Sequence, residues 1–450
     1  MNQPRRVGIL LALSLVLSAS RARALSDPVK DARNLGVSMV RDLKVAVKTR
    51  YFDPQFRGLD VDALFAGAEA RVREASTEAQ VGVILAQTMG EFRDSHTYFI
   101  PPIRPFDIDY GFEIRIVGDV PLVIEVDKGS DAEGKGVRLG DRLLSVDGTA
   151  VSRENFMAVS YALNVALPRR QLELRVQTDD DPARSITVEA SIEQRRKRID
   201  ITEWFDEVTD RMRRRPEVAW RYWTYEKEGV VVARLQTFMV TDELVNDLMS
   251  KVHKARALVL DLRGNPGGSI EALQTAAGAF FEQEIELASR KERKSTKVLR
   301  SRRPASRRLF SGALVVLVDS GSASSAEILA RVVQLEKRGQ VVGDRTAGAV
   351  MLAERLSLTA GNEIRFILYG ASITVADLLM KDGRSLEGDG VTPDEVVRPT
   401  ASDIREGRDP AMARAAKLAG LDLSPEAAGS HFRPRGEPEP KKKADAPPRP

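Results

Sequence analysis

The chain has 450 residues, of which 42% are hydrophobic and 30% are charged, and it contains no cysteine. That composition is typical of a soluble globular protein, and the length suits two or three domains. The lack of cysteine excludes disulfides, thiolate metal sites and cysteine nucleophiles. The formal net charge of +4 falls to zero without residues 1–24, which carry four arginines and no acidic residue, so charge does not argue for nucleic acid binding.

The first 24 residues have the pattern of a secretory signal peptide. Arg5 and Arg6 precede the apolar run Val7–Leu17, and the small-residue site Ala22–Ala24 follows. We expect cleavage before Leu25 and export to a periplasm or out of the cell. An uncleaved N-terminal anchor is the alternative, although the apolar run is short for a bilayer span. No stable membrane span is expected in the mature chain.

Residues 25–103 are predicted to form a helical domain. Apolar residues recur at helical spacing in three stretches, and a capping box at Thr77 and Gln80 opens the third. The three stripes are Leu35, Met39, Leu43 and Val47, then Leu64, Ala68 and Val72, then Val81, Leu85, Met89 and Phe92.

His96 follows these helices, in the short segment Asp94–Thr97, and is one of only three histidines. It lies at a domain junction between small hydroxyl residues. His253 falls in a charged stretch, 251–256, that is expected to be a solvated helix, and His431 falls in the expected tail. His96 is therefore the candidate general base, with a structural histidine as the alternative.

Residues 104–192 change to short β-rich runs around a predicted helix, 154–166, with a tight-turn signal at Asp147-Gly148. The runs are Leu122–Val126, Leu143–Val146, Leu172–Val176 and Ile186–Val188. The stretches 129–132, 136–141 and 146–148 resemble the central signature of a PDZ domain.

The resemblance implies that an extended peptide adds to this domain as a strand. The C-terminal carboxylate of the peptide then meets backbone N–H groups at Tyr110, Gly111 and Phe112. A PDZ-like spacer that binds nothing is the alternative.

Residues 193–425 alternate strands and helices, which predicts an α/β core. The expected strands are Val230–Leu235, Ala257–Leu262, Ala313–Val318 and a strand from Gln340, and the expected helices are Ser269–Phe281 and Ser325–Lys337. The fold class is therefore α/β within a multidomain α+β chain. The Pro- and Lys-rich residues 426–450 are expected to be disordered.

Two turns between a strand and a helix carry the candidate chemistry. The turn Asp261–Gly268 ends in adjacent glycines, whose N–H groups at a helix N-terminus suit an oxyanion hole. The turn Gly321–Glu327 places serines where a nucleophile is exposed at a sheet edge. A plain turn and a capping box of Ser324 with Glu327 are the corresponding alternatives without chemistry.

These pieces, in this order, resemble the carboxy-terminal-processing (tail-specific) serine peptidases from Asp27 to about Leu423. The resemblance continues through 343–346, 386–388, 390–394 and 407–410. It implies a core of the ClpP/crotonase-like type and a nucleophile at Ser324. It also implies oxyanion donors from the N–H of Ser325 and from Gly267 or Gly268.

One departure concerns the base. In the best-known branch a lysine follows Thr-x-Gly, but here Thr346-Ala347-Gly348 is followed by Ala349. A second branch, typified by the tricorn protease core, uses a histidine preceded by serine and a distal glutamate. Ser95-His96 and Glu387 match that pattern, so the resemblance implies a change of base rather than loss of activity.

The expected function is an exported endopeptidase that acts on unfolded chains or C-terminal tails through an acyl-enzyme, without metal or nucleotide cofactor. Two alternatives are a catalytically inactive peptide-binding scaffold and a carrier of an apolar small molecule, a role known for the interphotoreceptor retinoid-binding protein, which resembles this core.

Overall fold

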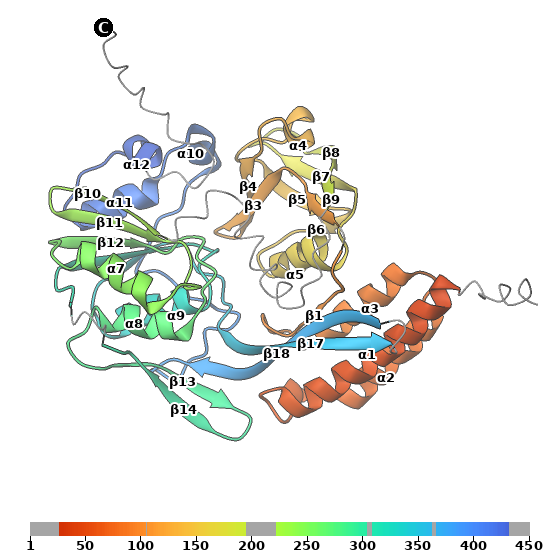
Figure 1. The fold of residues 1–450 in the computed structure, drawn as a ribbon. Coiled ribbons are helices and arrows are strands. Elements are labelled where there is room, and N and C mark those ends of the chain that lie inside the picture. The colour runs from red at the N-terminus through yellow and green to blue at the C-terminus, as the bar shows by residue number, and fades with distance from the viewer. Residues whose placement is uncertain (1–26, 105, 195–221, 304–307, 362–365, 432–450) are drawn as a thin grey trace, which may run out of the picture.

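The computed structural model describes residues 27–104, 106–194, 222–303, 308–361 and 366–431, so the expected signal peptide lies outside it. Figure 1 shows a red helical region at the lower right, an orange and yellow sheet domain above it, and a green and blue α/β core on the left. Within the described ranges, no helix has both the length and the apolarity that crossing a bilayer requires.

The helical region contains α1 (Pro28–Arg50), the short turn η1 (Phe56–Gly58), α2 (Val61–Glu74) and α3 (Glu78–Gly90). The predicted apolar stripes pack into one cluster, in which Leu43, Val47 and Leu85 are at most 1% exposed. The side chains of Asp27, Asp60 and Thr77 cap the three helices. The three predicted helices are therefore confirmed.

The sheet domain is antiparallel, with strand order β3-β4-β5-β7-β8 and β6 paired to β5. Its strands are β3 (Phe112–Val117), β4 (Val120–Val126), β5 (Arg142–Val146), β6 (Thr149–Ala150), β7 (Gln171–Gln177) and β8 (Arg184–Glu189). The ribbon β2 (Phe106–Asp109) with β9 (Ser191–Gln194) joins the two ends of the domain.

The helical elements of this domain are α4 (Asp131–Gly134) and α5 (Phe156–Tyr161), which continues as the π-helical turn η2 (Ala162–Ala166). The four predicted strands and the helix are confirmed. Asp147 and Gly148 both have positive φ, 48° and 75°, as a tight hairpin turn requires. Strand β3, which lies at the sheet edge, was not predicted.

The core is built on a sheet with strand order β10-β11-β12-β15-β16-β19, in which only the β10–β11 pair is antiparallel among the described strands. The strands are β10 (Tyr222–Lys227), β11 (Val230–Leu235), β12 (Ala257–Asp261), β15 (Ala313–Val318), β16 (Gln340–Gly343) and β19 (Glu395–Val396). The four core strands that the sequence predicted are confirmed.

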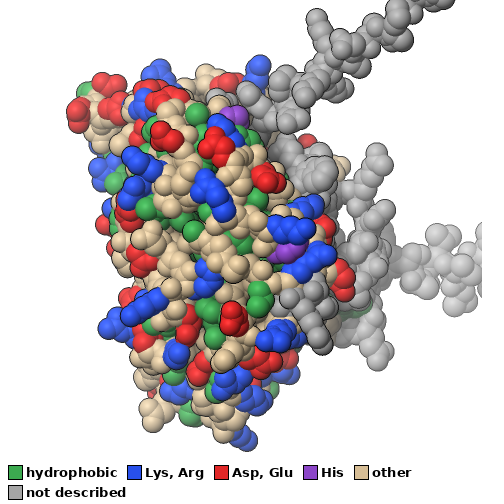
Figure 2. All heavy atoms as spheres, turned by 90° about the vertical axis from the view of Figure 1, so that its left-hand side faces the viewer, with side chains coloured by type: hydrophobic (Ala, Val, Ile, Leu, Met, Phe, Trp, Pro, Cys, Tyr) green, Lys and Arg blue, Asp and Glu red, His purple; other side chains and the backbone are tan. Residues whose placement is uncertain are grey.

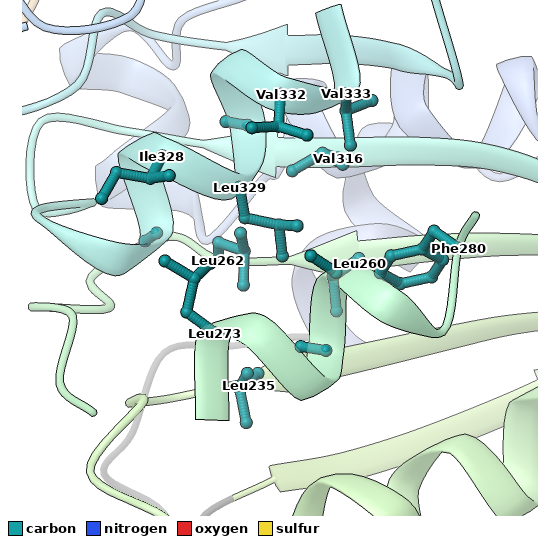
Figure 3. Close-up of a cluster of buried hydrophobic side chains, with 14 of the residues drawn as sticks. Leu235, Leu260, Leu262, Leu273, Phe280, Val316, Ile328, Leu329, Val332 and Val333 are labelled. Carbon is teal, nitrogen blue, oxygen red and sulfur yellow. The ribbon is translucent and has the colours of Figure 1, made fainter. Parts of the chain in front are cut away.

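Helices cover both faces of this sheet. On one face lie α7 (Asp242–Val252), α8 (Ile270–Gly278) and α9 (Ser325–Leu335), and on the other lie α11 (Pro410–Leu418) and α12 (Pro425–His431), after the short α10 (Ala401–Glu406). Figure 3 shows Leu260 and Val316 of the sheet packed against Leu273 of α8 and Leu329 of α9. Burial on both faces explains the nearly continuous apolar strands.

A second sheet links the core to the helical region. Its strand order is β1-β18-β13-β14, with β17 paired to β18. The strands are β1 (Tyr98–Ile100), β13 (Glu286–Glu292), β14 (Thr296–Arg300), β17 (Met351–Gly361) and β18 (Phe366–Leu379). In Figure 1 the β17–β18 hairpin runs from the core to the red helices, and Tyr369 and Ile373 belong to the helical cluster. This sheet was not predicted.

Two expectations near helix ends are wrong. Helix α12 extends to His431, so the tail does not begin at residue 426; the helix is held because Ala428 is buried against α11. Helix α7 ends at Val252, and His253 is its C-cap, instead of lying in a helix over 251–256.

On the face shown in Figure 2, positive and negative side chains are interspersed.

Candidate active site

Ser324 lies at the N-terminus of α9, on the turn that follows the buried strand β15. Its backbone has φ 55° and ψ −118°, a conformation that a residue with a Cβ rarely adopts. Its N–H donates to Glu327 Oε2 at 3.0 Å, and the residue is half-buried. The turn therefore presents the Ser324 side chain at the carboxyl edge of the sheet, as a nucleophile requires.

The turn after β12 packs against the Ser324 turn. Ala323 N–H donates to Asn265 O at 2.9 Å, and the Ser322 hydroxyl donates to Leu262 O at 2.8 Å. Gly267 lies so close that a Cβ there would come within 2.6 Å of Ser324 Cβ. The two turns that the sequence singled out are thus adjacent because β12 and β15 are neighbouring parallel strands.

The backbone amides beside Ser324 differ in how they are used. Gly267 is buried, and its N–H donates to Asn265 Oδ1 at 2.9 Å. Gly268 is exposed, with φ 147°, and Ser325 is the first residue of α9. In the described part of the chain, the N–H groups of Gly268 and Ser325 have no recorded hydrogen-bond partner. These two amides are the ones free to hold an anionic oxygen.

Ser95, His96 and Glu387 form a second group, although 292 residues separate Ser95 from Glu387. Ser95 Oγ lies 2.6 Å from His96 Nδ1 and donates to Glu387 Oε2 at 2.9 Å. Ser95 N–H donates to Glu387 Oε1 at 2.6 Å, and Val350 N–H donates to Oε2 at 2.9 Å. The structure therefore brings together the three residues that the resemblance implied.

The backbone at Ala349-Val350 connects this group to the Ser324 turn. Ala349 N–H donates at 2.9 Å to Glu327 Oε2, the oxygen that also accepts from Ser324 N–H. The next N–H, from Val350, donates to Glu387. Two adjacent N–H groups thus bond the two carboxylates: that of Glu327, which accepts from Ser324 N–H, and that of Glu387, which accepts from Ser95. No recorded contact in the described ranges joins the His96 ring directly to the Ser324 hydroxyl.

Burial shifts the pKa of three groups here. It lowers the pKa of His96 to about 4, with Asp94 opposing and Arg355 adding to the shift, so the ring is neutral at pH 7. Burial raises the pKa of Glu387 against the hydrogen bonds that favour its ionised form. Burial likewise raises the pKa of Glu327 to about 7, although Thr346, Gly348, Ala349 and Ser324 donate to it.

The loop predicted to bind a carboxylate precedes the edge strand β3. Tyr110 is buried, and its hydroxyl donates to Arg169 O at 2.9 Å. Gly111 has φ 72°, and a Cβ there would come within 2.4 Å of Ser130 Cβ. Phe112 begins β3, whose only recorded neighbour in the described part of the sheet is β4.

The far end of β3 touches the residues just before the Ser324 turn. Ser320 Oγ donates to Ile116 O at 2.5 Å. Arg115 pairs with Asp319 at 3.0 Å, and Asp319 accepts from Gly264 N–H and Gly321 N–H at 2.8 and 2.9 Å. The sheet domain is thus bonded directly to the residues just before the Ser324 turn, and Asp319 connects those residues to the turn after β12.

Sequence reasoning missed the residues that hold these turns. Asp319 and Asn265 each accept from backbone N–H groups within the site, and Asn265 also donates to Leu235 O at 2.8 Å. The spacing of Asn265 two residues before Gly267 was an available signal, because an Asn side chain commonly bonds the backbone two residues on. Asp319 had no such signal for its contact with Arg115, which is distant in sequence.

The chain is similar to known peptidases. Residues 229–397 match peptidase family S41. A carboxy-terminal-processing protease of Bartonella bacilliformis is 29% identical over 176 residues, which are 39% of this chain and 39% of that protein. A CtpA-like serine protease of Staphylococcus aureus is 23% identical over 294 residues, 64% of this chain and 52% of that protein. The chain thus spans about half or less of these relatives' length.

Two solved structures share the fold. Mature CPAF has a TM-score of 0.60 at 15% identity, with 83% of this chain and 95% of that one covered. The photosystem II D1 C-terminal processing protease has a TM-score of 0.53 at 20% identity, with 87% and 99% covered. The segment that matches peptidase family S41 contains Ser324, Glu387 and the turn Asp261–Gly268, whereas Ser95 and His96 lie before it.

Proposed function

We propose that this protein is an exported serine endopeptidase in which Ser324 is the nucleophile and His96 the base. The observation that carries the proposal is the hydrogen-bonded chain from Glu387 through Ser95 to the His96 ring, next to the Ser324 turn. The CtpA-like and carboxy-terminal-processing names of the relatives support the same reaction class.

The contacts of Ser95 determine the form of the His96 ring. The Ser95 hydroxyl directs its only proton to Glu387, whose oxygens also accept from two backbone N–H groups. Ser95 Oγ must therefore accept from Nδ1–H, since a hydroxyl has one proton to give. The other ring nitrogen, Nε2, then keeps its lone pair, which is the form that a general base needs.

The reaction follows from these positions. Ser324 Oγ attacks the carbonyl carbon of the substrate while His96 Nε2 takes its proton, and the Gly268 and Ser325 N–H groups hold the tetrahedral oxygen. His96 then gives the proton to the leaving amine, which leaves an ester on Ser324. A water molecule, deprotonated by His96, attacks that ester and releases the acid, and the proton returns to Ser324. The step needs no cofactor.

We also propose a PDZ role for the sheet domain, with unfolded proteins or C-terminal tails as substrates. Among the described strands, β3 pairs only with β4, so its other edge can take an added peptide strand over the residues before Ile116. The loop Tyr110–Phe112 stands at one end of that edge. The Gly111 N–H donates there to Asp109 Oδ1 at 2.9 Å, so a C-terminal carboxylate would take the place of that acceptor. The far end of β3 leads to the nucleophile turn through the Ser320–Ile116 contact.

Labelling with a fluorophosphonate probe tests the catalytic assignment. Ser324→Ala is expected to abolish labelling, and His96→Gln is expected to slow it at least 100-fold. His253→Gln is the matched control, because His253 is also half-buried but its ring bonds only Ser250 O among the recorded contacts. Labelling that survives Ser324→Ala, or that proceeds at the wild-type rate in His96→Gln, contradicts the proposal.

A further inference from the structure

The turn that carries His96 is organised around one carboxylate, that of Asp94. Its Oδ1 accepts from His96 N–H at 3.0 Å, from Thr97 N–H at 2.7 Å and from the Thr374 hydroxyl at 2.7 Å. Its Oδ2 accepts from the Tyr51 hydroxyl at 2.9 Å. Asp94 therefore fixes the two peptide units on either side of the His96 side chain.

The partners of Asp94 come from different parts of the fold. Tyr51 is the fully buried C-cap of α1, and its carbonyl accepts from Arg293 of the β13–β14 hairpin at 2.8 Å. Thr374 lies on β18, bonds the Thr97 hydroxyl at 3.0 Å and accepts through its carbonyl from Phe52 N–H. The helical region and the second sheet thus hold the same carboxylate.

The charges that face His96 include a guanidinium as well as carboxylates. Arg355, on β17, disfavours the protonated ring, whereas Asp94 favours it. Glu387 acts through Ser95, which separates its carboxylate from Nδ1. The negative charge with a direct effect on the ring is therefore that of Asp94.

We propose that Asp94 is a positioning residue for the reaction: it fixes the turn that aims the His96 ring and supplies negative charge that stabilises the imidazolium formed when Ser324 is deprotonated. This inference rests on the proposed function for its kinetic part only. Its structural part concerns the protonation of His96 and can be measured whether or not the chain cleaves peptides.

The alternative is that Asp94 only forms an Asx turn, which commonly ends a helical segment. Asp53 provides the comparison, because it accepts from Gln55 N–H and Arg57 N–H in the same manner. Asp53 has no recorded side-chain donor from another element of the described chain, whereas Asp94 has two, Tyr51 and Thr374. A turn that needed only local backbone bonds would not require them.

The experiment compares Asp94→Asn with Asp53→Asn in a His253→Gln, His431→Gln background, in which His96 is the only remaining histidine. NMR of ¹³C-labelled histidine follows the His96 titration directly. Asp94→Asn is expected to lower the pKa of His96 by about one further unit, because a carboxylate charge is removed. It is also expected to lower kcat 10- to 100-fold with little change in KM, and Asp53→Asn is expected to change neither quantity.

Tyr51→Phe keeps the Asp94 carboxylate and removes only the hydrogen bond to Oδ2. This variant replaces Asp94→Asn in the experiment if Asp94→Asn does not fold. It is expected to lower kcat several-fold and to leave KM unchanged. The inference is wrong if Asp94→Asn has the same His96 pKa and the same kcat as the background protein. If only Tyr51→Phe folds, the same two results in that variant overturn the inference. If the background protein itself fails to react with the fluorophosphonate, the proposed function fails, while the NMR comparison still decides whether Asp94 governs the His96 ring.

Discussion

The contact between Gly267 and Ser324 gives the sharpest test of the site's geometry. In Gly267→Ala, the new Cβ would lie 2.6 Å from Ser324 Cβ, 2.9 Å from Ala323 O and 3.0 Å from Ser325 N, so it overlaps the nucleophile turn. The residue also has φ 87°, which costs a side chain about 1–2 kcal/mol. Overpacking adds about 1–3 kcal/mol. We therefore expect about 2–5 kcal/mol of destabilisation.

Gly148→Ala separates the two contributions. Gly148 has φ 75°, and nothing lies within 4 Å of a Cβ there, so this variant carries the backbone cost of about 1–2 kcal/mol without a clash. Urea denaturation measures both free energies of unfolding.

The fluorophosphonate reaction then reports on the site itself. Gly267→Ala is expected to slow labelling of Ser324 by a factor of about 10²–10³, the usual effect of losing an oxyanion donor. The reason is that the overlap moves the Ser325 N–H away from its place beside the Gly268 N–H, so the two no longer bind the same oxygen. Gly148→Ala is expected to label at the wild-type rate. If folded Gly267→Ala protein also labels at that rate, the two turns do not act together, and the oxyanion assignment is wrong.

Four other outcomes are expected. Glu387→Gln should lower kcat/KM for peptide hydrolysis 10- to 100-fold without preventing folding, because Ser95 loses a charged acceptor; an unchanged kcat/KM would remove Glu387 from the mechanism. Since burial lowers the pKa of His96 to about 4, protonation of His96 should lower kcat/KM only below about pH 5. The unfolded chain binds this proton below pH 6.5, so about 3 kcal/mol of stability is lost as the pH falls from 6.5 to 4; His96→Gln should lack that loss in urea titrations. Asn265→Ala should cost about 2–4 kcal/mol by the same measurement, because Gly267 N–H and Leu235 O lose their partner in a buried site.

The position of Ser324, the proposed nucleophile, follows from local sequence, whereas the position of His96, the proposed base, does not. The apolar runs 257–262 and 313–318 predict buried strands before the glycine-rich turn and before the serine-rich turn. Because the two strands are parallel neighbours, their carboxyl ends lie together. Ser95, which contacts the His96 ring, reaches Glu387 in a part of the fold where β1 pairs with β18. That pairing joins residues 270 or more positions apart, and periodicity carries no information on it.

Other features depended on contacts that a motif does not encode. Whether Gly267 or Gly268 offers a free N–H depends on which of them the Asn265 side chain occupies. The β17–β18 hairpin was missed because its burial does not alternate regularly: one part packs on the helical region and another on the core. Edge strand β3 was missed for a similar reason, since most of it is only half-buried.

The replacement of the lysine of the best-known branch by Ala349 is consistent with an intact site, because the backbone of this position has a structural task. The N–H of Ala349 and the N–H of Val350 bond two different carboxylates, Glu327, which also accepts from Ser324 N–H, and Glu387, which also accepts from Ser95. The segment therefore sets the spacing between Ser324 and His96 through peptide groups, which any residue except proline supplies. A side-chain base at residue 349 is then unnecessary, provided that His96 accepts the proton.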